Sequence, residues 1–554
     1  MEQHLNNNSG LLQTRIVRKG DDYLDSFYWK HTMGGSIAES LETEIPNWTH
    51  QNAVFICAQP GRGKTTFVRD VLIERATRSG KNVLLLSSRL ANSVQQKRMI
   101  AKQLGYQKIL ENLTERGLRE HIDFGCVKIM TYQGVSAFLK DSSQADWLRN
   151  TEYVIFDECQ YFAVDALFNK YAGSTLRNLI RTFSQSIRIY MTATPYDVQD
   201  ILARAEKNKY YSYVDFATNR WIPTCCRCIH YYNFPADYSA YRVDFFSDYY
   251  EDIVPKISEN ANDKWLIFCE NKGQGQNLQT YLQNKCQIQA AYLDADRKDT
   301  PEWETLCCNE QFDEQVLICT TVLDCGVNIH DKALRHIVLA ADNQTTFIQC
   351  LGRKRLDAHE TVKVHVMEPD AKLCANRKNS IKQKLQLFDQ YDTSPHQRLL
   401  ATLVNDPNPS NSALFYYGPD SHRSKNAGLF KNCEAEHVLR RREAFYDGLT
   451  SGKITFREEV NRWLQFSAEI HEEDFAEPLR RFYEQNKGRA LGTEEQDTIR
   501  KLVLQYAKNA KVKTVRKSRE QTLDVSALNR ILEDSGLHYL ISPKWVMHCT
   551  SEGV

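Results

Sequence analysis

The segment Ala58-Gln-Pro-Gly-Arg-Gly-Lys-Thr-Thr66 constrains the fold of this chain more than any other part of its sequence. An apolar run from Ala53 to Cys57 precedes it, and a stretch with apolar residues at helical spacing follows it. This order predicts a strand, a tight glycine loop and a helix. Backbone N–H groups in such a loop, at the positive end of a helix, bind phosphate oxygens. The segment therefore predicts a nucleotide-binding loop in an α/β sheet.

The residues of this loop have distinct expected roles. Lys64 is expected to reach the β- and γ-phosphates of ATP, and the Thr65 hydroxyl is expected to hold Mg²⁺. The usual first glycine of the pattern is replaced by Ala58, so the loop alone leaves an ordinary glycine-rich turn open. The predicted nucleotide-binding residues are Gly61, Arg62, Gly63, Lys64, Thr65 and Thr66.

A pair of adjacent carboxylates supports the nucleotide interpretation. The apolar run Tyr153-Val-Ile-Phe156 is typical of a strand that is buried on both faces, and Asp157-Glu158-Cys159-Gln160 follows it directly. Ligands of open α/β sheets bind at this end of a strand. We expect Asp157 to hold Mg²⁺ through water and Glu158 to orient and deprotonate the attacking water. The loop and the carboxylates together predict an ATPase site with ATP and Mg²⁺ as cofactors.

Short apolar runs alternate with amphipathic stretches twice along the chain, which predicts two parallel-sheet α/β domains in series. The first block contains Ala53–Cys57, Asn82–Ser87, Cys126–Met130, Tyr153–Phe156 and Ile187–Met191. The second contains Trp265–Cys269, Ala290–Leu293, Gln315–Cys319, His336–Ala340 and Val362–Val366. The link from Leu202 to Phe246 gives no clear pattern. We expect an N-terminal extension (1–44), a first domain (45–220), a second domain (221–370) and a mainly helical accessory domain (371–554), with helices near Glu436–Phe445, Glu458–Phe466 and Glu495–Ala510.

Composition limits the possible partners and the compartment. The 71 Lys and Arg residues nearly balance the 70 Asp and Glu residues, so any surface for nucleic acid must be local. The start of the chain is polar and no apolar run approaches about 18 residues, which predicts a cytoplasmic protein without a membrane partner. The 16 cysteines are expected to be reduced thiols. The cluster Cys225-Cys226-Arg-Cys228 lacks a second ligand pair at zinc spacing, although His230 is near.

Further segments over roughly residues 45–370 resemble motifs of the superfamily 2 helicases of DEAD/DEAH-like, bacterial or phage type. This family has two tandem RecA-like domains with ATP in the cleft between them. Met191-Thr192-Ala193-Thr194-Pro195 is similar to the motif that couples ATP to the nucleic-acid track, which implies this role for Thr192 and Thr194. Two further segments resemble elements that contact the nucleic-acid strand. They are Leu84-Leu-Leu-Ser-Ser-Arg89, followed by Gln95-Gln96, and Ile129-Met-Thr-Tyr-Gln133. The resemblance implies that Arg89 and Thr131 contact its phosphates.

The second block supplies the family's remaining motifs. The run from Leu317 to Ile329 resembles the fifth motif, which implies a strand-contacting Thr320 and nucleotide-facing positions at Gly326 and Asn328. Phe347-Ile-Gln-Cys-Leu-Gly-Arg-Lys-Arg355 resembles the sixth, whose arginines reach the γ-phosphate. The implied catalytic residues here are Gln349, Arg353 and Arg355. Arg353 fits the family spacing, so we expect its loss to be the more damaging. The second arginine would fall at Leu356, and Arg355 is its nearest replacement.

The resemblance implies an ATP-dependent helicase or translocase that moves on nucleic acid. DNA is expected in preference to RNA, because the box reads Asp-Glu-Cys-Gln and no adenine-reading glutamine motif precedes the phosphate loop. Protein partner subunits are left open. Two alternatives remain: a nucleic-acid-binding ATPase switch that clamps or remodels without unwinding, and a protein-directed P-loop NTPase. The motifs of the second block disfavour the last alternative, since such an NTPase needs no contacts to a track.

Overall fold

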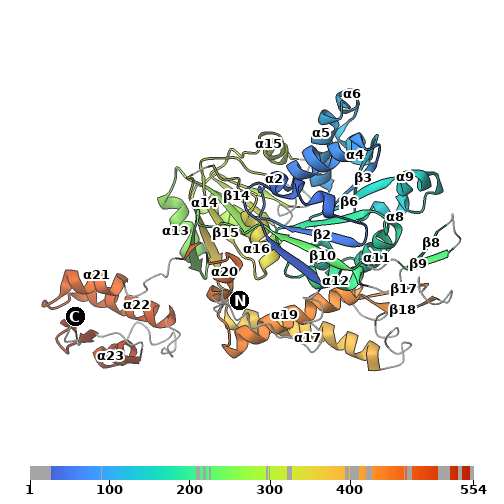
Figure 1. The fold of residues 1–554 in the computed structure, drawn as a ribbon. Helices are drawn as coiled ribbons and strands as arrows, with labels where there is room; N and C mark the ends of the chain where they lie inside the picture. The colour runs from blue at the N-terminus through green and yellow to red at the C-terminus, as the bar shows by residue number, and fades with distance from the viewer. Residues whose placement is uncertain are drawn as a thin grey trace, which may run out of the picture. The chain divides into compact units, whose positions relative to one another are not determined.

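The structure, a computed structural model, describes residues 27–88, 90–207, 212–215, 220–223, 226–294, 297, 300–320, 327–357, 359–393, 399, 403, 411–419, 427–466, 468–470, 477–509, 524–534 and 539–549. The chain divides into two compact units, Met1–Ile470 and His471–Val554 (Figure 1). The first unit contains two separate parallel sheets, which define a first and a second domain.

Within the described ranges, eight strands form the sheet of the first domain, in the order β1-β10-β2-β7-β6-β3-β5-β4. Every neighbouring pair is parallel except β4 with β5. The strands are β1 (Tyr28–Thr32), β2 (Asn52–Cys57), β3 (Asn82–Ser87), β4 (Asp123–Phe124), β5 (Val127–Thr131), β6 (Thr151–Asp157), β7 (Ile187–Thr192) and β10 (Cys228–Asn233). Apolar side chains cover both faces: Leu84 and Leu86 pack in one cluster, and Val83 and Leu85 pack in the other. Burial of both faces explains why inner strands such as β3 and β6 contain continuous apolar runs.

Helices connect these strands and cover the sheet. The glycine loop leads into α3 (Lys64–Phe67), which continues through a π-helical stretch (Val68–Ile73) into α4 (Glu74–Arg78). The other helices of this domain are α2 (Ile37–Glu42), α5 (Leu90–Gln103), α6 (Gln107–Asn112), α7 (Glu115–Glu120), α8 (Val135–Phe138), α9 (Ala145–Arg149), α10 (Tyr161–Val164), α11 (Ala172–Thr182) and α12 (Gln199–Glu206).

The sheet of the second domain is parallel throughout and has the described strand order β13-β14-β12-β15-β16-β11-β19. Its strands are β11 (Tyr241–Phe246), β12 (Lys264–Cys269), β13 (Ala290–Leu293), β14 (Val316–Thr320), β15 (Leu334–Leu339), β16 (Val362–Met367) and β19 (Glu469–Ile470). Its helices are α13 (Val254–Glu259), α14 (Lys272–Lys285), α15 (Pro301–Asn309) and α16 (Gln344–Leu351).

The two predicted parallel-sheet domains are confirmed, and each of the ten predicted strands is present to within two residues at either end. The domain boundaries differ from those expected. Strand β1 lies in the expected N-terminal extension, and β10 follows residue 220, yet both belong to the first sheet. The chain therefore crosses to the second domain between Asn233 and Tyr241. Sequence patterning missed this because β10 and β1 mix aromatic and polar residues.

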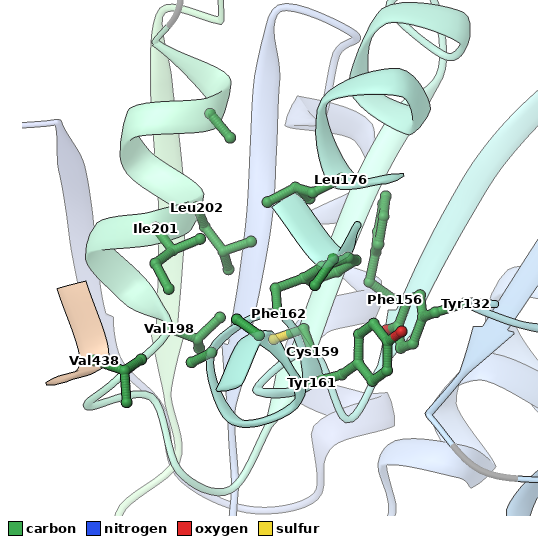
Figure 2. Packing of buried hydrophobic residues seen from close by; sticks show 14 of the residues in the cluster. Tyr132, Phe156, Cys159, Tyr161, Phe162, Leu176, Val198, Ile201, Leu202 and Val438 are labelled. Atoms are coloured by element: carbon green, nitrogen blue, oxygen red, sulfur yellow. The ribbon is translucent and has the colours of Figure 1, made fainter. Parts of the chain in front are cut away.

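The expected accessory region, 371–554, is divided between the two units. Helices α17 (Ala371–Thr393) and α19 (Cys433–Ser451) run side by side in the first unit (Figure 1). The hairpin of β17 (Phe415–Pro419) and β18 (Ala427–Lys431) and the short α20 (Phe456–Trp463) also belong to this unit. Figure 2 shows Val438 of α19 beside Val198, in the same buried cluster as Phe156 and Phe162 of the first domain. Helix α19 is therefore part of the core of the first domain.

The second unit has a small core of its own. It contains α21 (Glu477–Asn486), α22 (Thr493–Asn509), α23 (Val525–Asp534) and a hairpin of β20 (Tyr539–Ile541) and β21 (Met547–Cys549). Leu479, Ile499, Val503 and Leu528 are buried together in this core. In neither unit do the described residues include a helix that is long and apolar enough to span a bilayer.

Candidate nucleotide site between the two domains

The glycine loop begins where β2 ends. The Ala58 N–H donates to the Thr192 carbonyl at 3.0 Å, which ties the loop to the end of β7. Gly61 and Gly63 have φ angles of +81° and +93°, a left-handed conformation that residues with a Cβ adopt at a cost. Helix α3 begins directly after Gly63, with the first helical N–H groups at the loop. The local geometry is that of a phosphate-binding cradle.

The Lys64 ammonium lies against this loop. Its Nζ donates to the Ala58 carbonyl at 2.6 Å and to the Gln59 carbonyl at 3.2 Å, and the residue is 8% exposed. The neighbouring Thr65 is half-buried, whereas Arg62 and Thr66 are exposed. The carbonyls of its own loop therefore hold the Lys64 ammonium at the cradle, where phosphate recognition places a cation.

The two adjacent carboxylates have different surroundings. Asp157 is the last residue of β6 and is 4% exposed, and its Oδ2 accepts a hydrogen bond of 2.6 Å from Gln96 Nε2. Glu158 is half-buried and has a φ of +52°, which is uncommon for a residue other than glycine. Strained backbone of this kind gathers at functional sites.

A buried chain of hydrogen bonds joins Glu158 to the end of β7. Gln160 Nε2 donates to Glu158 Oε2 at 2.6 Å, and Gln160 Oε1 accepts from the Thr192 hydroxyl at 2.7 Å. The Thr192 hydroxyl oxygen also accepts from the Thr194 N–H at 2.9 Å. Thr192 and Thr194 are fully buried. The glutamine that ends the Asp-Glu-Cys-Gln box is therefore a bridge between Glu158 and the segment predicted to couple the ATP site to a nucleic-acid track.

Three consecutive loop residues contact the second domain or the link that leads to it. Gln59 Oε1 accepts from the Asp237 N–H at 2.7 Å, in the link between β10 and β11. A Cβ atom on Gly352, just after α16, would overlap the Pro60 ring. A Cβ atom on Gly61 would lie 2.9 Å from Arg355 Nη1. The second domain thus closes against the glycine loop.

The side chain of Arg355 is held from its own domain. Its Nε and Nη2 donate to Asn328 Oδ1 at 3.0 and 2.7 Å. Burial and the nearby Arg353 charge lower the pKa of Arg355, while Glu158 across the site opposes the shift. Arg353 is 7% exposed, and its Nε donates to the Gln349 carbonyl at the end of α16. The geometry therefore favours Arg355 over Arg353 as the arginine that faces the loop, the reverse of the expectation from family spacing.

The residues predicted to contact a nucleic-acid strand are described in part. Thr131 ends β5, is half-buried, and its hydroxyl accepts from the Gly134 N–H at 3.2 Å. Thr320 ends β14 and is 7% exposed, and its hydroxyl oxygen is buried without a hydrogen-bond partner among the described residues. Both threonines thus hold the same place in their sheets, at the carboxyl end of a strand. Arg89 and the predicted nucleotide-facing Gly326 lie outside the described residues.

The donors at this site fit a magnesium nucleotide. Mg²⁺ prefers hard oxygen ligands, and the Thr65 hydroxyl and the Asp157 carboxylate supply them. The cradle is lined by backbone at Gly61 and Gly63, where a side chain would intrude or strain the chain. No group of three or more His, Cys, Asp or Glu side chains placed to hold a metal occurs in the described ranges.

Sequence reasoning missed several residues of this site. Gln160 carried a signal, because it is the last letter of the box, but its bridging role depends on the fold. Gln96 follows an element that resembles a strand-contacting motif, and the structure directs its amide to Asp157 instead. The contact of Asp237 with Gln59 spans 178 positions and has no local signal.

Two family models match the chain. "Type III restriction enzyme, res subunit" matches residues 26–197, and "Helicase conserved C-terminal domain" matches residues 248–355. No curated protein sequence matches the chain. These two matches fall on the first and the second domain, respectively.

Solved helicase structures are similar at low identity. Dbp5 of S. cerevisiae bound to RNA and ADP BeF3 is 15% identical over 58% of this chain and 80% of its own, with a TM-score of 0.40. The Mycobacterium smegmatis helicase Lhr bound to ssDNA and AMP-PNP is 16% identical over 63% of this chain and 48% of its own, with a TM-score of 0.44. Mss116p bound to ssRNA and AMP-PNP is 12% identical over 92% and 94%, with a TM-score of 0.44.

The family matches and the ordered motifs point to the same assignment. The first match covers the glycine loop, the carboxylate box and the Thr192 segment. The second match ends at Arg355, the arginine that faces the loop. The chain therefore belongs to the superfamily 2 helicases, whose motor consists of two RecA-like domains.

Proposed function

We propose that this protein is an ATP-dependent helicase or translocase that moves on a nucleic-acid strand, DNA in preference to RNA. The observation that carries the proposal is the approach of Arg355, from the second domain, to Gly61 in the phosphate loop of the first. An ATP site that needs both domains responds to their relative movement, so closure and hydrolysis become linked. The preference for DNA rests on the Asp-Glu-Cys-Gln box.

The proposed division of labour at the ATP site follows from the charges that surround it. Lys64 and the N–H groups at Gly61 and Gly63 bind phosphate oxygens, and Thr65 and Asp157 hold Mg²⁺. When bound, Mg²⁺ neutralises charge on the β- and γ-phosphates. Glu158 orients the attacking water and accepts its proton.

Two arginines then complete the site from the second domain. Arg355 acts as the arginine finger at the γ-phosphate, and Asn328 holds its guanidinium in place. Arg353, seated on the carbonyl of Gln349, contributes positive charge behind it.

The proposed coupling to a strand runs through the buried bridge from Glu158 to Thr194. Because Gln160 contacts both the hydrolytic carboxylate and Thr192, a shift at the nucleotide changes the end of β7. Thr131 and Thr320, with Arg89, are proposed to contact phosphates of the strand. Such contacts carry no sequence information, so binding should tolerate sequence and weaken as salt rises.

The ATPase rate, measured alone and with single-stranded DNA, duplex DNA or RNA, tests this function. Stimulation by one of these polymers at low salt supports a motor, and Lys64→Ala and Glu158→Gln should each abolish turnover. Glu158→Gln should retain ATP binding, because Glu158 acts mainly on the attacking water. If no polymer binds or stimulates the wild-type protein, the protein-directed alternative is favoured. Strand displacement on a fork separates unwinding from clamping.

A further inference from the structure

Gln96 contacts the predicted magnesium carboxylate from a helix of the first domain. It lies on α5, is 2% exposed, and donates through Nε2 to Asp157 Oδ2 at 2.6 Å. The two residues are 61 positions apart. A buried carboxylate that accepts a short hydrogen bond is restricted in its rotation, so the direction of its other oxygen is fixed as well.

The surroundings fix both partners of this contact. The next residue on α5, Lys97, is 1% exposed and donates to the carbonyls of Leu118 and Arg119 at 3.1 and 2.9 Å. This anchors α5 to the end of α7. On the other side, the Tyr132 hydroxyl donates to the Asp157 carbonyl at 2.8 Å. The amide and the carboxylate therefore meet between elements that are held independently.

The choice of an amide has a chemical consequence. A lysine or arginine at this place would neutralise Asp157 and compete with a divalent cation for it. An uncharged donor orients the carboxylate and leaves its full negative charge for the metal. The Gln96 Oε1 atom is buried and accepts no hydrogen bond within the described part of the chain. An acceptor beside a carboxylate suits Mg²⁺, which keeps several waters when it binds to proteins.

We propose that Gln96 is a positioning residue for Asp157, and that its amide sets the affinity of the site for the magnesium form of ATP. This inference rests on the proposed ATPase function and adds to it a residue that acts on the metal through Asp157. Residues that orient a metal ligand are typically worth about 10- to 100-fold in metal affinity or activity.

The test variant is Gln96→Met, which keeps the length of the side chain and removes the donor. Its affinity for a fluorescent ATP analogue is measured by titration, once with Mg²⁺ and once with EDTA. We expect affinity to fall about 10- to 100-fold with Mg²⁺ and to stay near the wild-type value with EDTA. The Mg²⁺ concentration for half-maximal ATPase should rise by a similar factor. Equal affinity loss under both conditions would indicate a structural role and overturn the proposal.

Gln103→Leu is the matched control. Gln103 lies at the end of the same helix, is exposed, and donates to the Arg69 carbonyl at 3.1 Å. Removing that amide should leave the magnesium dependence unchanged. An increase in the half-saturating Mg²⁺ concentration like that of Gln96→Met would contradict the assignment to Gln96.

If the wild-type protein itself shows no magnesium-dependent nucleotide binding, the proposed function fails rather than the role of Gln96.

Discussion

The guanidinium of Arg355 lies over the backbone of Gly61, so close that a Cβ atom on the glycine would be 2.9 Å from Nη1. Side chains that alternate along an extended backbone explain why Arg355 reaches the glycine loop. Residues 353–355 run beside Ile329, which donates to the Arg353 carbonyl and accepts from the Arg355 N–H. Alternate residues point to the same side, so Arg353 and Arg355 share a face while Lys354 is buried beneath. Leu356 packs on the core of the second domain, which is why the second arginine precedes it.

Arg355→Ala should abolish most ATP turnover and retain nucleotide binding. An arginine finger is typically worth about 10³- to 10⁵-fold in rate, because it stabilises charge that develops in the transition state. Arg355→Lys should recover little, since a lysine cannot hold Asn328 with two donors. Single-turnover hydrolysis, measured beside Arg353→Ala, checks this assignment. A larger loss in Arg353→Ala would restore the expectation from family spacing.

Gly61→Ala should damage catalysis beyond its cost in stability. Alanine at this position has to adopt the left-handed backbone conformation of Gly61, which costs about 1 to 2 kcal/mol. Its methyl group would also contact the guanidinium of Arg355. Gly80→Ala is the matched control, because Gly80 has a φ of +64° and a Cβ atom there would meet no described atom within 4 Å. Denaturant unfolding should show similar losses for the two variants. Only Gly61→Ala should lose ATP turnover, and comparable turnover in both would contradict the contact with Arg355.

Much of the fold could be predicted because burial leaves a plain mark on sequence. Strands covered on both faces, such as β3 and β6, read as unbroken apolar runs. The glycine loop and the carboxylate box could be predicted because their chemistry depends on residues adjacent in sequence. The order of the motifs then indicated that the second domain supplies arginines to the first.

The remaining features depend on contacts that local patterns do not encode. Strand β10 reads Cys-Ile-His-Tyr-Tyr-Asn, and its burial becomes clear only when β1 and β2 flank it. The amide of Gln96 meets Asp157 only because β3 and β6 are neighbours in the sheet. The choice between Arg353 and Arg355 depends on a backbone pairing with Ile329. In each case, distant segments decide the outcome.

Thr192→Val should uncouple ATP hydrolysis from movement along the nucleic-acid strand. Valine keeps the shape of threonine but leaves Gln160 Oε1 without its donor in a buried site, at a cost of about 1 to 3 kcal/mol. We expect the unstimulated ATPase to persist and strand displacement per ATP to fall. Ser186→Ala removes another buried hydroxyl, which donates to the Thr151 carbonyl at 2.7 Å. That control should lose comparable stability but keep the wild-type strand displacement per ATP. Equal displacement per ATP in the two variants would contradict the coupling role of the Glu158-to-Thr194 bridge.

Stability should fall as the pH is lowered from about 6.5, because the unfolded chain takes up protons at histidines that stay neutral in the folded protein. His336 stacks on Trp265 and lies 3.0 Å from His365 through Nδ1 and Nε2. Burial lowers the pKa of His336 to about 4, against the opposing effect of Asp263, and lowers the pKa of His365 as well. The contribution of these two histidines to stability is fully present above the pKa of an unfolded histidine, about 6.5, and is lost as the pH falls toward 4.

Thermal melting between pH 7 and pH 4.5 checks this dependence. His336→Phe keeps an aromatic ring over Trp265 and removes one titrating group, so its melting temperature should fall less steeply with pH than that of the wild type. The absolute stability should drop, since the hydrogen bonds to His365 and Asp263 are lost. A slope equal to that of the wild type would show that other groups control the acid sensitivity.

Arg441 of α19 should be needed to hold the segment that follows Thr194. Its guanidinium lies 3.6 Å from the centre of the Tyr196 ring, and Nη1 donates to Asp200 Oδ2 at 3.1 Å. Five residues further along α19, Tyr446 contacts Asp342 in the second domain, and Arg377 of α17 contacts the same carboxylate. The two helices therefore connect the Tyr196 segment with the loop that leads into α16.

Arg441→Ala should lower the free energy of unfolding by on the order of 3 kcal/mol, because it leaves the buried Asp200 without this cation. The neighbouring Arg440→Ala is the matched control. Arg440 pairs with the exposed Asp389, and such surface pairs contribute about 0 to 1 kcal/mol. Its other partner, the half-buried Glu436, keeps Lys431 as a second cation. Urea unfolding separates the two variants. Because Tyr196 closely follows Thr192 and Thr194, which we propose to couple the ATP site to the nucleic-acid strand, Arg441→Ala should also reduce polymer stimulation of the ATPase under conditions where the variant is fully folded. Stimulation at the wild-type level would limit α19 to a structural role.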